Sequence, residues 1–229
     1  MRKLAGVLVA FLLFAGVAFA GAFPDGPGGP KIAVLNRSTV LTDAQVAAAV
    51  PAFQKYLDQV CAAWHCAGTL YFTPNPVGAR DWAITVNDKS SIPGAIGYHD
   101  LVKVPIGWVS AATAAANGVQ WTEVFTHELA EMLVDANIAL WSRHAKVDRF
   151  YALEVCDPVQ GRTYTIDGVT VADYVYRSWF TENASGPYDS MRSLSAPFQL
   201  WTDGWAIIYQ DGHETTIGDL AAAGLYGDG

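Results

Sequence analysis

The stretch TEVFTHELAEMLVDAN, residues 122–137, constrains the fold more than any other part of the sequence. On a helical wheel its single histidine and three of its carboxylates gather within an arc of roughly 100°. These residues are His127, Glu128, Glu131 and Asp135. Apolar side chains occupy most of the remaining circle, so the pattern predicts a helix whose polar arc has apolar walls on both flanks.

Two interpretations of this polar arc are open. It can be the solvated face of an amphipathic helix, which is the common case. A solvated face is usually wider, however, and the sequence has no Lys or Arg from residue 104 through residue 142. Because like charges at helical spacing repel each other, the cluster needs a counter-charge, and a metal ion would supply one.

The composition sets the broad class of the protein. The chain has 229 residues, of which 52% are hydrophobic, and a formal net charge of −8. This is enough apolar material for one ordinary core. The acidic balance argues against nucleic acid and against anionic membranes as partners.

The first twenty residues resemble a secretory signal peptide in their order of features. A short basic start precedes an apolar stretch that ends with Ala18 and Ala20. An uncleaved membrane anchor is the alternative, since about 17 apolar residues is the lower limit for a span. The flexible stretch at 21–30 favours cleavage after Ala20. We therefore expect a secreted, extracellular protein that has no membrane attachment after signal removal.

Three cysteines are present in a chain that we expect to be exported. Cys61 and Cys66 are close enough in sequence to form a disulfide, which an oxidising compartment would preserve. Cys156 would then be free and buried. His65 lies between the pair, but this spacing matches no standard zinc site.

The order of expected elements indicates one α+β domain over residues 31–229. Strands are expected at 31–36, 69–73, 81–87, 94–100 and 101–109, and helices at about 42–60 and 122–137. A loop of small residues, 110–118, should connect the last of these strands to the second helix. Beyond residue 140 the pattern weakens to an irregular C-terminal half with a hairpin at 164–175 and a last strand and turn at 205–214.

The spacing within HELAE suits metal chemistry. Residues four apart on a helix lie one above the other, so His127 and Glu131 can bind one ion side by side. Glu128 points to one side of that pair, where it can take a proton from a metal-bound water. This is the logic of the H-E-x-x-H motif, whose glutamate is the general base. Here Glu131 replaces the second histidine.

With this motif and the element order of residues 31–136, the chain resembles a zincin-type metallopeptidase domain. In that family a mixed sheet with a short edge strand precedes the motif helix, and the edge strand pairs with the substrate. The resemblance implies substrate binding by the stretch GAIGYH, which contains Gly94, Ala95, Ile96 and Tyr98. His99 should line the cleft or face solvent on this strand, with metal binding as an alternative.

The third metal ligand of the family comes from further along the chain. The segment EVCD at 154–157 offers Glu154 and Asp157 for this role. The stretches THELAEMLVD and EVCDPV also resemble a group of uncharacterised phage and bacterial proteins, secreted or virion-associated. That likeness implies no particular activity.

An acidic ligand set changes the expected metal. One neutral and two anionic ligands would cancel the charge of Zn²⁺ and polarise its water less than histidine-rich sites do. Zn²⁺ is the first expectation, while oxygen-rich ligation lets Ca²⁺ or Mn²⁺ compete.

Three functions remain open at this point. The first is a secreted metal-dependent peptidase with Glu128 as general base and a peptide or protein as substrate. The second is a non-catalytic protein of zincin fold, which serves as an extracellular or virion-surface module and binds a partner. The third is a glycoside hydrolase with Glu128 and Glu154 as its carboxylate pair, which suits this clustering of acids less well.

Overall fold

The computed structural model describes residues 28–226 except residue 79. The expected signal peptide, residues 1–20, lies outside the described residues. The helices are α1 (Asp43–Trp64), α2 (Ala111–Ala116), α3 (Trp121–Val134) and α4 (Leu220–Ala223), and short 3₁₀ helices cover Ala145–Val147 and Asp157–Val159. The strands are β1 (Lys31–Asn36), β2 (Thr69–Phe72), β3 (Trp82–Asn87), β4 (Gly97–Leu101), β5 (Pro105–Ser110), β6 (Trp141–His144), β7 (Arg149–Ala152), β8 (Thr163–Ile166), β9 (Val169–Ala172), β10 (Trp205–Gln210) and β11 (His213–Gly218). The predicted α+β class is confirmed.

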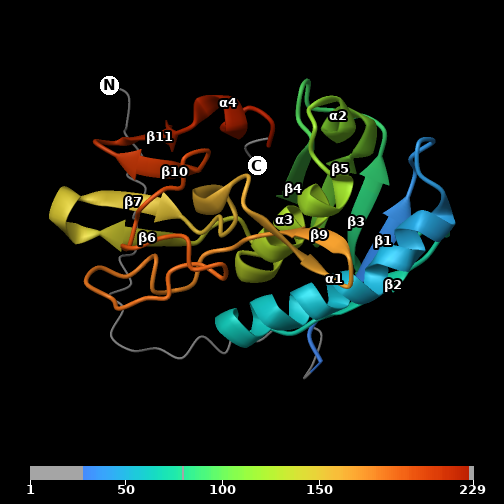
Figure 1. Cartoon of the computed structure of the whole chain (residues 1–229), viewed down its shortest axis with the longest axis horizontal. Coiled ribbons are helices and arrows are strands. Elements are labelled where there is room, and N and C mark those ends of the chain that lie inside the picture. Colours follow the sequence, from blue (N-terminus) through green and yellow to red (C-terminus); the bar gives the residue numbers. More distant parts are fainter. Residues whose placement is uncertain (1–27, 79, 227–229) are drawn as a thin grey trace, which may run out of the picture.

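A five-stranded mixed sheet forms the first half of the molecule (Figure 1). Its order is β2-β1-β3-β5-β4, in which neighbouring strands run parallel except for the antiparallel pair β4 and β5. In the register, Ile84 of β3 lies between Val34 and Gly107. Because the antiparallel strand β4 is last in this order, it is an edge strand.

Helices α1 and α3 pack on the same face of this sheet. Ile32, Val34 and Ile84 are fully buried in one core cluster with both helices. The two helices meet where the ring of Phe53 stacks on that of Phe125, with centroids 4.1 Å apart. In Figure 1, α3 lies at the centre of the molecule, between the first sheet and the strands of the second half. The polar arc of α3 is thus placed inside the protein.

Several expected boundaries are wrong. The stretch 110–118, expected as a loop, contains helix α2, because alanine has the highest helix propensity of all residues. Helix α1 continues to Trp64, since Cys61 and Trp64 extend its buried face. Helix α3 ends at Val134, so Asp135 is its C-cap rather than a member of the helical arc.

The second half is more regular than the sequence indicated. A four-stranded antiparallel sheet has the order β11-β10-β7-β6, and β8 and β9 form the expected hairpin. The hairpin of β6 and β7 was missed because the side chains of β6 are all exposed or half-buried and show no apolar alternation. Strand β9 packs against α3, where the Ala172 N–H donates to Thr126 Oγ1 at 2.9 Å.

Cys61 and Cys66 form a disulfide at the end of α1, and Cys156 is free and buried. Among the described helices, none combines the length and the apolar character needed to cross a bilayer.

Candidate metal centre

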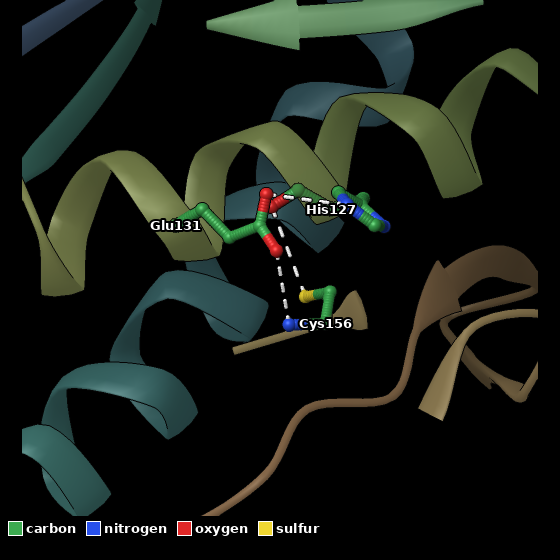
Figure 2. Close-up of side chains that lie close together, drawn as sticks. All are labelled: His127, Glu131 and Cys156. Atoms are coloured by element: carbon green, nitrogen blue, oxygen red, sulfur yellow. Dashed lines mark hydrogen bonds and ion pairs between the residues drawn. The ribbon is translucent and has the colours of Figure 1, made fainter. Parts of the chain in front are cut away.

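The centre of the site is one turn of α3. His127 and Glu131 lie four residues apart on this helix, and His127 Nε2 is 3.2 Å from Glu131 Oε2. The Glu131 carboxylate lies between the His127 ring and Cys156 and contacts both (Figure 2). His127 and Glu131 are 2% and 3% exposed, so the polar arc faces the protein interior and is not a solvated surface.

The segment after β7 supplies the next groups. The Cys156 N–H donates to Glu131 Oε1 at 3.1 Å and so fixes the orientation of that carboxylate. Asp157 Oδ1 lies 3.1 Å from His127 Nε2. A backbone hydrogen bond from the Val175 N–H to the Val155 carbonyl anchors the segment to the second half. Of the two expected third ligands, Asp157 is therefore the one beside His127.

Glu154 lies elsewhere in the cluster. Its Oε2 atom is 3.8 Å from His99 Nε2. His99 projects from β4 and is 8% exposed, so of its expected positions the one that faces solvent is wrong, while the alternative of a metal ligand fits its spacing from Glu128 and Glu131. Its Nδ1 atom lies 3.1 Å from Glu128 Oε2 and 3.8 Å from Glu131 Oε2. His99 thus joins the edge strand to the acidic residues of α3.

Glu128, the expected general base, is buried against the start of β4. A Cβ atom added to Gly97 would lie 2.4 Å from Glu128 Oε1, so only glycine lets strand and carboxylate approach this closely. Glu128 Oε1 has no hydrogen-bond partner among the described residues. His99 therefore holds one oxygen of the carboxylate, and the other oxygen is buried without a hydrogen-bond partner among the described residues.

Two groups of three residues have the spacing of metal ligands. One ligand atom from each of His127, Glu131 and Cys156 lies within 4.8 Å of the other two, and the same holds for His99, Glu128 and Glu131. Cys156 was not expected as a ligand. Its place directly before Asp157 was the only signal for it in the sequence.

The burial of these groups shifts their pKa values. Burial alone would lower the pKa of His99, but the hydrogen bond to Glu128 and the charges of Glu154, Glu128 and Glu131 raise it to about 10. Burial and the nearby charge of Glu131 raise the pKa of Glu154 to about 8. Burial and Glu131 also raise the pKa of the Asp157 carboxyl and that of the Cys156 thiol.

The charge balance of the cluster is unusual for a protein interior. Five carboxylates are buried around two histidines, and they belong to Glu128, Glu131, Asp135, Glu154 and Asp157. The ion pairs of Glu128, Glu131, Glu154 and Asp157 in the described part of the chain involve histidine alone. Burial raises the pKa of the carboxyls of Glu128, Asp135, Glu154 and Asp157, because an uncompensated buried charge is costly. A divalent cation would favour the ionised carboxylates and replace protons held in the cluster.

A divalent cation fits this donor set. Ligand atoms about 2.1 Å from one zinc ion in a tetrahedron lie roughly 3.4 Å from each other. The separations of His127 Nε2 from Glu131 Oε2 and from Asp157 Oδ1 are close to that value, while Asp157 belongs to neither of the two spaced groups. Glu154 Oε2 and His99 Nε2 are buried without a hydrogen-bond partner among the described residues, and Asp157 Oδ1 is buried with His127 Nε2 as its ion-pair contact. The cluster can therefore hold a metal ion.

Asp135 has a different role from the one its position in the polar arc indicated. Its Oδ2 atom accepts hydrogen bonds from the N–H groups of Ala139 and Leu140, at 2.9 and 2.6 Å. It therefore closes the turn after α3, with burial raising the pKa of its carboxyl.

The expected substrate-binding residues are only partly on the edge strand. Strand β4 begins at Gly97, so Gly94, Ala95 and Ile96 precede it. Ala95 and Ile96 are buried, at 1% and 0% exposed. Tyr98 is on the strand, half-buried, with its ring stacked on Trp108 at 4.5 Å. The expected edge strand, 94–100, thus begins three residues too early and ends one residue too early.

Comparison with protein-family models, with curated proteins and with solved structures found no match to this chain.

Proposed function

We propose that this protein is a metal-dependent peptidase of zincin-like architecture, with the metal held by His127, Glu131 and Asp157 and with Glu128 as general base. The observation that carries the proposal is the position of His127 Nε2, which lies within 3.2 Å of both Glu131 Oε2 and Asp157 Oδ1. Glu128, the residue after the histidine, lies beside this set with one oxygen unpartnered among the described residues.

The arrangement of the elements supports the proposal. Peptidases of this kind need an exposed sheet edge next to the metal, so that a substrate can pair with it. Strand β4 is an edge strand of the five-stranded sheet, and its His99 contacts α3 through Glu128 and Glu131. The site and the edge are therefore in direct contact.

The chain itself would supply positioning and proton transfer. A divalent ion bound here would polarise the substrate carbonyl and acidify a water molecule. Glu128 takes a proton from the attacking water and delivers it to the leaving amine, which is ordinary general acid–base chemistry. His99 holds Glu128 in place through its Nδ1 atom. Burial excludes bulk water from the reacting groups.

The donor types favour Zn²⁺ over Ca²⁺ or Mn²⁺. An imidazole nitrogen and a nearby thiol suit zinc, whereas calcium takes oxygen ligands almost exclusively. His127 and Cys156 belong to one of the two spaced groups. The two carboxylates of Glu131 and Asp157 would neutralise the ion, and we therefore expect a weaker effect on the water than at a histidine-rich site.

A second candidate function is a non-catalytic module that uses the metal for stability and binds a partner at its surface. The degree of burial favours this candidate, because all of the metal-ligand candidates are less than 9% exposed. A structural site is closed, whereas a catalytic site keeps a position open.

We also propose that the protein acts outside the cell. The signal-like sequence of residues 1–20 and the Cys61–Cys66 disulfide are both typical of exported proteins.

Hydrolysis of a labelled protein substrate such as casein, measured with metal content, tests the proposed reaction. We expect Glu128→Gln to abolish hydrolysis while the bound metal stays, since Glu128 is not among the proposed ligands. Glu214→Gln is the matched control, because Glu214 is an exposed glutamate on β11. Equal hydrolysis by Glu128→Gln and by the wild type would refute the role of Glu128. Metal binding without any turnover would favour the second candidate.

A further inference from the structure

The segment of residues 219–226 lies directly over the candidate metal centre. It leaves β11, forms α4, and reaches the start of β4 (Figure 1). There the Ile96 N–H donates to the Leu225 carbonyl at 2.6 Å, and Gly97 and Tyr226 form a parallel β-bridge. On its other side Gly97 pairs with Val109 of β5. Tyr226 therefore occupies the outer edge of β4.

The side chain of Tyr226 covers the site itself. Its ring stacks on the imidazole of His127, with centroids 4.0 Å apart and planes 19° apart. Its hydroxyl accepts a hydrogen bond from Gln160 Nε2 at 3.2 Å. Tyr226 is 4% exposed, so this ring closes the metal centre at the point where the edge strand begins.

The bridge at Gly97 is also the point where Glu128 meets the strand. Glu128 Oε1 lies so near Gly97 that a Cβ there would approach it to 2.4 Å. Any peptide that pairs with β4 beside the general base must take the backbone positions that Leu225 and Tyr226 hold. The edge from Tyr98 to Leu101 has no further strand partner among the described residues.

We infer that the 219–226 segment is an intramolecular occupant of the peptide-binding edge and blocks the site until it is displaced. The inference rests on the proposed peptidase function. Sheet edges bind extended peptides through backbone hydrogen bonds and select them through side-chain pockets. The 219–226 segment makes a backbone hydrogen bond with Ile96, and its Tyr226 side chain packs on His127. The occupant also indicates the substrate class, which is an extended peptide with an aromatic side chain that stacks on His127.

The segment is attached in a way that permits displacement. Leu220 is 64% exposed, and α4 has a single turn. Leu225 and Tyr226 pack against the core and are held to the rest of the molecule by the hydrogen bond from the Ile96 N–H, the hydrogen bond from Gln160 and the ring stack on His127. An extended peptide can make the same kinds of contact, so it can compete with the segment for this edge.

The test uses the full chain and three variants. Tyr226→Ala removes the stack and the hydroxyl, Tyr226→Phe keeps the ring, and Tyr209→Ala is the matched control because Tyr209 is 43% exposed on β10. We expect kcat/KM for peptide hydrolysis to rise at least about tenfold in Tyr226→Ala, as when a site that is open a tenth of the time becomes open throughout. Tyr226→Phe keeps the ring stack but loses the hydrogen bond from Gln160, so its kcat/KM should rise less than that of Tyr226→Ala, and metal content should be unchanged in all variants.

Hydrogen exchange of the Ile96 amide is the second readout, and it needs neither metal nor turnover. The Leu225 carbonyl protects this amide, and we expect its exchange to be at least about tenfold faster in Tyr226→Ala. Hydrolysis that is equal in Tyr226→Ala and the wild type, with metal bound in both, would overturn the inference and leave the peptidase proposal intact. Absence of turnover in every variant would contradict the peptidase proposal. In that case unchanged exchange of the Ile96 amide would overturn the blocking role as well, and faster exchange would support it.

Discussion

Replacement of Gly97 by alanine tests the contact between the edge strand and the general base. The new Cβ would lie 2.4 Å from both Glu128 Oε1 and Val124 Cγ1, whereas ordinary contact begins at 3.4 Å. Strand or helix must therefore move by about 1 Å. Val124 is β-branched and fully buried, so its side chain has little room to turn away. Overpacking of this kind costs about 1–3 kcal/mol of folding free energy.

The same displacement should affect catalysis more strongly than stability. A misplacement of about 1 Å in a reacting group can reduce a rate about 100-fold, and Glu128 Oε1 is one of the two atoms that the new methyl group contacts. We therefore expect kcat/KM of Gly97→Ala for peptide hydrolysis to fall about 100-fold, with metal content retained. Urea unfolding would measure the loss of stability in the same preparation.

Gly78→Ala is the control for this prediction. A Cβ at Gly78 would meet Asp81 Oδ2 at 3.6 Å, which is an ordinary contact, so this variant should retain both activity and stability. Wild-type activity and wild-type stability in Gly97→Ala would refute the close packing of β4 against Glu128.

Three further predictions concern the frame of the molecule. Burial raises the pKa of Asp173 to about 7 from 3.8, with Asp189 contributing, so the folded state keeps a proton that the unfolded chain loses. The free energy of unfolding should therefore fall as pH rises from about 4 to about 7, and a urea series at several pH values should show a shallower slope for Asp173→Asn than for the wild type. Phe125→Ala removes a fully buried ring stacked on Phe53 and should cost about 3–5 kcal/mol in urea unfolding; a loss under 1 kcal/mol would contradict the packing of α1 on α3. Thr42→Ala removes the N-cap of α1, whose hydroxyl accepts a hydrogen bond from the Gln45 N–H. This variant should lose about 1 kcal/mol of folding free energy, and an unchanged thermal midpoint would contradict the capping role of Thr42.

The helix of the site could be predicted from sequence because its signals are local. The distance between His127 and Glu131 follows from helical geometry, and so does the position of Glu128 beside them. The same is true of the Cys61–Cys66 pair, which is five residues apart. The short apolar run of β1 was also predicted as a buried strand with the bounds that the structure has.

The remaining parts of the site depend on contacts between distant segments. The burial of His99 depends on how β4 packs against α3, and no local pattern encodes that packing. Cys156 donates to Glu131 only because the segment after β7 returns to the helix. Tyr226 reaches His127 from the far end of the described chain. Such tertiary contacts overrode the tendency of a histidine on an edge strand to face solvent.

Elemental analysis of the purified protein tests the central claim most directly. We predict about one equivalent of zinc in the wild type, the same in His213→Ala, whose histidine is exposed, and none in His127→Ala, which loses the imidazole between Glu131 and Asp157. Absence of metal from the wild type, even after zinc is added, would contradict the metal centre and the peptidase proposal with it.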